Sequence, residues 1–152
     1  MPGAERSALT AFGRGLIDEI EAMGVEVRYA INGDEQRLLE VSNARAVINF
    51  WGDSPQDTQI LLREDANNAT VYEEYLHALE GQKRGWTSVR DSIERLTEEM
   101  RVGRQVLTRA DELGMTTHER AEVERTIQSY LKMLRIQVVD APLQDQDNEQ
   151  TR

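Results

Sequence analysis

The chain of 152 residues contains no cysteine. It therefore has no disulfide framework, no zinc site built on thiolates and no cysteine nucleophile. Long hydrophobic runs are also missing, because no apolar segment approaches the ~20 residues that cross a bilayer. The N-terminus lacks the basic region and apolar block of a signal peptide. These absences predict a protein with no membrane span and no signal peptide, for which the cytoplasm is the default compartment.

Basic residues are outnumbered, with 18 Lys and Arg against 28 Asp and Glu, so the formal net charge is −10. Binding to a nucleic acid backbone depends on clustered Lys and Arg, and we expect no nucleic acid partner. An acidic balance instead favours attraction to a basic protein. Hydrophobic residues make up 39% and charged residues 30%, which is typical of a soluble globular domain with exposed charged helices.

The N-terminal half reads as one helix followed by three short strands. Apolar residues recur at helical spacing over 9–20, and Gly24 ends that run. Alternating or apolar segments at 25–31, 44–51 and 58–64 predict strands, with a hairpin turn at Asn32-Gly33. The segment 36–42 fits either a strand or a short helical turn.

From Asn67 onward the sequence pattern is helical. We expect a helix that is capped by Asn68 or Thr70 and runs to about Glu80, and a longer one over about 88–113, ended by Gly114. A capping box, Thr116 to Glu119, starts the next helix and makes an antiparallel helical hairpin. The fold class is thus α+β: an N-terminal helix, a small mostly antiparallel β-meander, a central helix and a C-terminal helical hairpin. Residues 1–136 form one domain, and 137–152 form a polar, disordered tail.

The central helix carries the motif EEYLH at 73–77. At helical spacing Glu73 and His77 lie on one flank, where two residues four apart can hold one ion. The next residue, Glu74, points further from the core and can reach a water molecule as a general base. The core face of this helix is formed by Ala69, Tyr72, Tyr75, Leu76 and Leu79.

A third ligand is expected from the long helix. Glu99 lies on its flank, whereas Glu98 and Glu94 point roughly away from the apolar seam, so Glu99 is the first choice and the other two are alternatives. Two carboxylates and one imidazole can hold a divalent metal with an open position. Zinc is the first candidate, although a carboxylate ligand lowers its Lewis acidity and the set also suits manganese or iron.

The competing interpretation is an acidic helix whose flank is simply solvated. Other constellations are weaker. His118 and Glu122 also stand four apart, but at the start of a helix, where a surface or capping role is expected. Trp51 and Trp86 are expected as core or cleft-edge aromatics.

Two segments carry a resemblance to a known family. The runs TQILLREDANNATVYEEYLHALEGQKRGW and ERLTEEMRVGRQVLTRADELGMTTHERAEVERTIQSYLKML resemble the zincin-like metallopeptidase domains of bacterial polymorphic toxins, over roughly 45–134. In that family an edge strand and a short loop lead into a helix with a variant of HExxH. The resemblance implies Glu73 and His77 as ligands, Glu74 as the catalytic glutamate, and Glu99 or Glu98 as the last ligand.

The function that follows is a metal-dependent hydrolase of zincin type, a peptidase-like toxin or effector domain acting on a protein or peptide. Such a domain would be delivered as an effector and have a cognate immunity or adaptor protein. The family motif has histidine where this chain has Glu73, which leaves an inactive domain open. The alternative function is a non-enzymatic acidic interaction domain, of immunity or adaptor type, that binds a basic protein partner.

Overall fold

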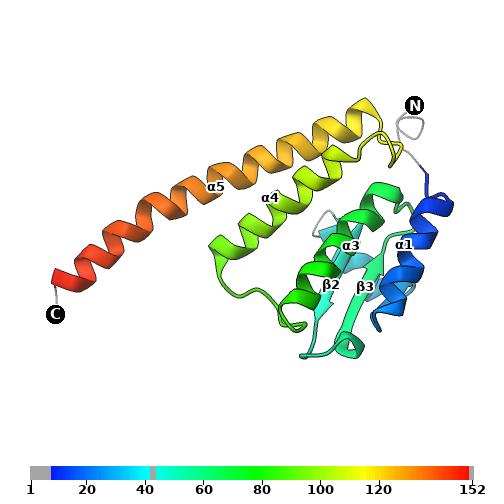
Figure 1. The fold of residues 1–152 in the computed structure, drawn as a ribbon, viewed down its shortest axis with the longest axis horizontal. Helices are drawn as coiled ribbons and strands as arrows, with labels where there is room; N and C mark the ends of the chain where they lie inside the picture. Colours follow the sequence, from blue (N-terminus) through cyan, green and yellow to red (C-terminus); the bar gives the residue numbers. More distant parts are fainter. Residues whose placement is uncertain (1–7, 42–43, 151–152) are drawn as a thin grey trace.

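The computed structural model describes residues 8–41 and 44–150, with side chains up to Gln137. It confirms the α+β class: a small three-stranded sheet carries helices that follow the predicted layout (Figure 1). The elements in chain order are α1 Ala11–Ala22, β1 Glu26–Tyr29, α2 Gly33–Val41, β2 Ala46–Phe50, the 3₁₀ turn η2 Pro55–Asp57, β3 Thr58–Leu62, α3 Asn68–Lys83, α4 Ser92–Thr108 and α5 Thr117–Gln150. No helix in this part of the chain is both long and apolar enough to cross a membrane.

The sheet has the order β1-β3-β2, with the buried strand β3 in the middle. The pair β2–β3 is antiparallel, as a meander predicts, and places Ile48 opposite Ile60. The pair β1–β3 is parallel instead, with Val27 opposite Ile60. β2 is thus an edge strand, because its only strand partner in the described residues is β3.

The predicted hairpin turn at Asn32-Gly33 is wrong. Asn32 Oδ1 accepts a hydrogen bond from the backbone N–H of Glu35 at 2.8 Å, so Asn32 caps α2. Asn suits both a turn and a helix N-cap, and here the following residues continue as a helix up to Val41. In place of a tight hairpin, the intervening helix separates β1 from β2, and β3 lies between them and pairs with both. Of the two alternatives for 36–42, the described residues adopt the helical one.

α3 is the central element of the fold. It packs against α1 and β2 on one side and against α4 on the other. The close approach to β2 depends on Gly81, since a Cβ there would lie 2.5 Å from the ring of Phe50. Asn67 begins the helix by accepting a hydrogen bond from the backbone N–H of Thr70 at 2.9 Å, one residue earlier than predicted.

The predicted core face of α3 is only partly right. Tyr72 and Leu76 are buried, but Ala69, Tyr75 and Leu79 remain half-exposed. The opposite side is buried as well, through Val71, Glu74, His77 and Ala78. Because neighbouring elements cover α3 on two sides, its polar side is buried as well. The sequence pattern of a single apolar stripe does not predict this second buried side.

α4 and α5 form the expected antiparallel hairpin (Figure 1). Gly114 has a φ of 68° at the turn, a conformation that favours glycine. The capping box is confirmed, because Thr116 N donates to Glu119 Oε1 at 2.9 Å and Glu119 N donates to Thr116 Oγ1 at 3.1 Å. The backbone of α5 stays helical up to Gln150, through most of the segment expected as a tail. The boundary after residue 136 stays a prediction, because side chains beyond Gln137 lie outside the described part.

Candidate metal centre

The two helices α3 and α4 bring the three predicted ligands together. Glu73 and His77 project from successive turns of α3, and Glu99 projects from α4 beside them. One ligand atom from each lies within 4.8 Å of the others. A histidine with two carboxylates at this separation could hold a divalent ion. The group is also partly enclosed, since His77 is buried and both carboxylates are half-buried.

The imidazole of His77 is held in one orientation. Its Nδ1 lies 2.7 Å from Glu98 Oε2, and its Nε2 lies 3.4 Å from Glu99 Oε2. Glu98 is itself hydrogen-bonded to Arg84. Once the proton on Nε2 is displaced, Nδ1 still donates to Glu98 and the lone pair of Nε2 points to the side where Glu99 lies. A carboxylate behind a histidine is the usual support of a metal-binding imidazole.

The structure therefore assigns Glu98 a different position from the one predicted. It does not point away from its neighbours; it is buried between His77 and Arg84, because α3 approaches α4 on that flank. Burial alone would raise the pKa of Glu98, but the hydrogen bonds to His77 and Arg84 and their positive charges lower it. Glu94 stays exposed in the first turn of α4, which Asp91 caps, and takes no part in the site.

Glu74 is the most unusual residue of the site. Its side chain was expected to point away from the core, but it is 7% exposed and lines a cleft. Its Oε2 is buried with no hydrogen-bond partner among the described residues. Burial, followed by the repulsion of Glu73 and Glu99, raises the pKa of Glu74 to about 8 although His77 acts in the opposite direction. A buried polar atom left in this way is typical of a functional position.

The charges of the cluster are compensated by protons in the ion-free protein. Burial raises the pKa of Glu73, with Glu99 adding to the effect and His77 opposing it. Burial would lower the pKa of His77, but the hydrogen bonds to Glu98 and Glu99 raise it to about 11. The ion-free cluster thus retains protons that an isolated glutamate or histidine would lose at neutral pH. A divalent cation would take over the same compensation.

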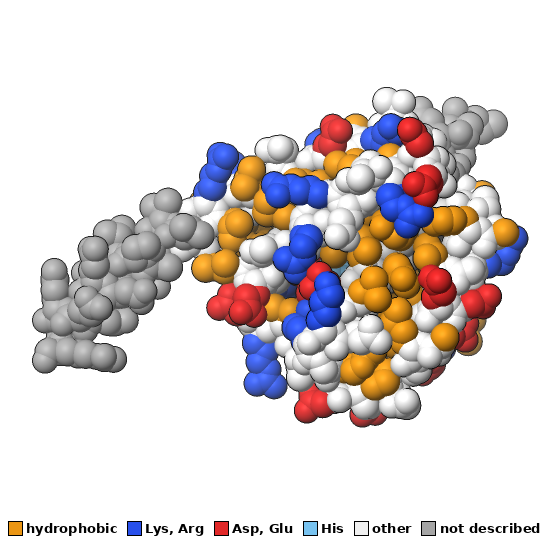
Figure 2. Space-filling view, in the orientation of Figure 1, with side chains coloured by type: hydrophobic (Ala, Val, Ile, Leu, Met, Phe, Trp, Pro, Cys, Tyr) orange, Lys and Arg blue, Asp and Glu red, His pale blue; other side chains and the backbone are white. Residues whose placement is uncertain are grey.

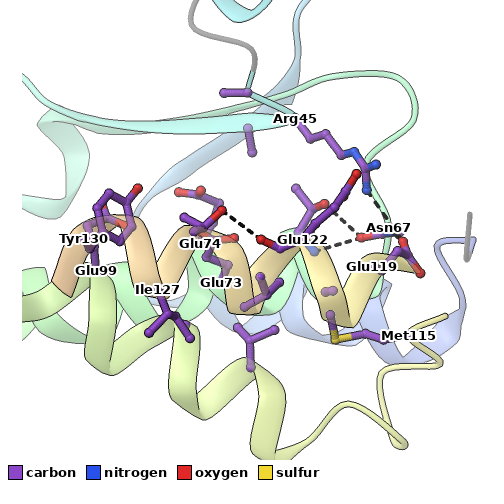
Figure 3. Close-up of a pocket in the computed structure, with 18 residues that line it drawn as sticks. Arg45, Asn67, Glu73, Glu74, Glu99, Met115, Glu119, Glu122, Ile127 and Tyr130 are labelled. Atoms are coloured by element: carbon purple, nitrogen blue, oxygen red, sulfur yellow. Dashed lines mark hydrogen bonds and ion pairs between the residues drawn. The ribbon is translucent and has the colours of Figure 1, made fainter. Parts of the chain in front are cut away.

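A cleft of about 360 Å³ opens beside these residues. Its walls come from α3, α4, α5 and the start of β2, and include small apolar side chains such as Ala46 and Ala69. Figure 3 shows Glu73, Glu74, Glu99 and Tyr130 toward one end. Two of the three candidate ligands, Glu73 and Glu99, and the buried Glu74 therefore line the cleft.

The opposite end of the cleft is a structural junction. Asn67 Nδ2 donates to Glu119 Oε2 at 2.6 Å, which ties the cap of α3 to the capping box of α5. Arg45, just before β2, approaches the same Glu119 oxygen at 3.6 Å (Figure 3). The polar groups at this end of the cleft therefore pair with one another and connect α3, α5 and the start of β2.

The remaining candidates lie outside the site. His118 is exposed and its Nε2 pairs with Glu122 Oε1 at 2.9 Å, which confirms the expected surface role. Trp86 is buried in the core, whereas Trp51 is 74% exposed. Tyr130 is half-buried and lines the cleft, which its place in the sequence of α5 alone does not indicate.

Comparisons with protein-family models, with curated proteins and with solved structures found no match to this chain. The chemistry of the site is therefore the basis on which a function can be assigned.

Proposed function

We propose that the chain is a metal-dependent hydrolase of zincin type, in which Glu73, His77 and Glu99 bind the ion and Glu74 is the general base. The observation that carries the proposal is the buried, unpartnered Oε2 of Glu74 beside a three-residue group with the composition of a metal site. A solvated acidic flank would expose its carboxylates to water, and the burial of Glu74 disfavours that interpretation.

The donor set suits a divalent transition metal. Zinc binds carboxylate and imidazole at about 2.0–2.2 Å, so two ligands of one ion lie at most about 4.4 Å apart, and side chains whose ligand atoms lie within 4.8 Å would have to close around it. Three protein ligands leave a position open, as catalytic sites require. Glu98 would fix the imidazole and raise its basicity. Two carboxylates also admit manganese or iron, with zinc our first choice.

The ion, when bound, would polarise the scissile carbonyl and lower the pKa of water. Glu74 would then take a proton from the attacking water as its oxygen bonds to the carbonyl carbon. The same proton would pass to the leaving nitrogen as the carbon–nitrogen bond breaks. A neighbouring cation would lower the pKa of Glu74 from about 8, so that the carboxylate form is available near neutral pH.

A peptide or protein is the substrate class that we favour. β2 is one of the two edge strands of the sheet, and the segment around Arg45 forms one wall of the cleft. An extended peptide can add to such an edge through main-chain hydrogen bonds. The resemblance to toxin-associated zincins extends the proposal to a toxin or effector role with a cognate immunity protein.

The first test is metal content. Protein purified without chelator should contain about one equivalent of a transition metal by elemental analysis, and the metal-free protein should take up one equivalent of zinc in a calorimetric titration. Glu73→Gln and His77→Phe should abolish this stoichiometry. The matched control is Glu94→Gln, an exposed glutamate of α4 outside the cluster. Equal uptake by all variants, or no uptake by the parent chain, would refute the proposal.

The second test separates an active from an inactive site. Zinc-loaded protein is incubated with a mixed peptide library, and cleavage is followed by mass spectrometry. Glu74→Gln should retain zinc and lose cleavage. If the parent chain binds zinc but cleaves nothing, the substitution of the motif histidine by Glu73 has produced an inactive zincin.

The acidic interaction domain remains the alternative outcome of these tests. On the face shown in Figure 2, acidic side chains alternate with basic and apolar ones and do not form one acidic field. A basic partner would bind with an affinity that falls steeply as salt rises. Salt-sensitive capture of such a partner by protein that binds no metal would favour the alternative.

A further inference from the structure

The cleft beside the candidate metal centre is rich in hydrogen-bond acceptors and poor in donors. Five carboxylates line it: Glu73, Glu74, Glu99, Glu119 and Glu122. An ionised carboxylate only accepts hydrogen bonds. A hydrolase must also stabilise the negative charge that develops on the attacked carbonyl oxygen, and a hydrogen-bond donor would add to the stabilisation that the ion supplies.

Most donors on the cleft walls are already used. The Thr70 hydroxyl donates to Asn67 Oδ1 at 2.9 Å, and the Thr126 hydroxyl donates to the carbonyl of Glu122 at 3.0 Å. The Asn67 amide donates to Glu119, which Arg45 also approaches, at the far end of the cleft. Within the described residues, the hydroxyl of Tyr130 is the cleft-lining side-chain donor that makes neither a hydrogen bond nor an ion pair, since Arg45 pairs with Glu119.

Tyr130 also stands at the correct end of the cleft. It belongs to α5, and in Figure 3 its ring lies beside Glu99, on the side where Glu73 and Glu74 are found. A phenol has an ordinary pKa of about 10, so the hydroxyl keeps its proton over the whole neutral range.

We propose that Tyr130 is a further catalytic residue, whose hydroxyl donates a hydrogen bond to the scissile carbonyl oxygen of the substrate as negative charge develops there. The inference rests on the proposed function. The proton stays on Tyr130 throughout, so the residue stabilises charge and transfers nothing. Removing one such donor in a hydrolase costs about 10²–10³-fold in turnover. The surrounding carboxylates would otherwise repel the developing charge.

The test uses an oxygen ligand in place of an unknown substrate. The metal-free chain is loaded with Co(II), whose visible spectrum reports the ligands, and is titrated with acetohydroxamate, which presents a negatively charged oxygen. Tyr130→Phe should bind Co(II) with unchanged affinity and bind acetohydroxamate about 10–100-fold more weakly, the usual effect of losing one hydrogen bond to a charged group. Imidazole, a neutral nitrogen ligand, should bind both proteins equally.

The control is Tyr75→Phe, which removes the hydroxyl of a half-buried tyrosine on α3 that does not line this cleft. It should change none of the three affinities. Unchanged acetohydroxamate binding by Tyr130→Phe would overturn the assignment. So would equal weakening of acetohydroxamate and imidazole, which indicates a structural role. If the parent chain fails to bind Co(II), the proposed function fails, and the role of Tyr130 fails with it.

Discussion

At the scale of single residues, the site is a problem of charge compensation. Glu73, Glu74 and Glu99 surround one histidine, and one oxygen of Glu74 has no partner in the described part of the chain. Burying an ionised carboxylate without compensation is costly, so such a group holds a proton or lies near a cation. The ion-free and ion-loaded proteins should therefore differ in how they respond to pH.

Glu74→Gln tests this in the ion-free protein. The pKa of Glu74 is about 8 in the folded protein against 4.5 for the ordinary group. Between pH 4.5 and 8 the folded state thus holds a proton on Glu74 that the unfolded state has lost. The contribution of this proton to the free energy of unfolding is complete below pH 4.5 and is lost as pH rises toward 8. Glutamine does not titrate, so the variant should gain stability relative to the parent by at most ~1.4 kcal/mol per pH unit across that window.

The measurement is urea unfolding with a chelator present, at pH 5 and at pH 8. Glu94→Gln, which removes an exposed carboxylate, provides the comparison for a general loss of negative charge. A stability difference between Glu74→Gln and the parent that is the same at both pH values would contradict the raised pKa.

Glu98→Gln tests the support of the histidine. The substitution weakens the hydrogen bond to His77 Nδ1 and leaves Arg84 without its anionic partner. Loss of such support typically lowers metal affinity by about 10–100-fold. We expect zinc titration calorimetry to show this loss with one equivalent still bound. Glu80→Gln, on the same helix as His77 and paired with the exposed Arg101, should leave the affinity unchanged.

At the scale of elements, the sequence predicts the features that depend on one helix or one turn alone. The pairing of Glu73 with His77 follows from helical periodicity alone, and the turn at Gly114 and the capping box follow from the residue types at the helix ends. The pairing of β1 with β3 and not with β2 was not predictable in this way, because Asn32 suits a hairpin turn and a helix cap equally well. The helical form buries Leu39 of α2, a tertiary contact that the turn signal does not contain.

The contacts between elements account for the other differences. Glu98 and Glu99 are about 100° apart on α4, so a small change in helix rotation decides which of them faces the metal side. The role of Glu98 depends on Arg84, which lies beyond the last turn of α3. Glu74 is buried only because elements on both sides cover α3, and Tyr130 reaches the cleft only because α5 crosses beside α4.

Asn67→Ala tests how one side chain joins two helices. Asn67 is 1% exposed, caps α3 and donates to Glu119 in the capping box of α5. Its removal deletes a cap, worth about 1 kcal/mol, and leaves a buried carboxylate oxygen with fewer donors, at about 1–3 kcal/mol. We expect a loss of roughly 2–4 kcal/mol in denaturant unfolding. Asp91→Ala removes an exposed cap of α4 and should cost about 1 kcal/mol. Equal losses would show that the link to Glu119 contributes nothing.

At the scale of the whole molecule, an ion would connect two elements of a chain that carries an excess of negative charge. Its ligands come from α3 and α4, and the formal net charge of the chain is −10. An ion that binds only the folded state stabilises it by about 2.7 kcal/mol when its concentration is 100 times Kd. For a chain of this size that corresponds to a rise of roughly 5–10 °C in Tm.

Thermal unfolding with zinc and then with chelator should show this rise and its reversal. Sodium chloride at matched ionic strength should give a much smaller shift, because screening acts weakly on charges buried from solvent. Glu73→Gln should lose the response to zinc, since it removes one ligand, while Glu94→Gln should keep it. A zinc response that is equal in both variants would mean that the ion binds to the acidic surface instead. The stabilisation would then come from non-specific neutralisation and not from a link between α3 and α4.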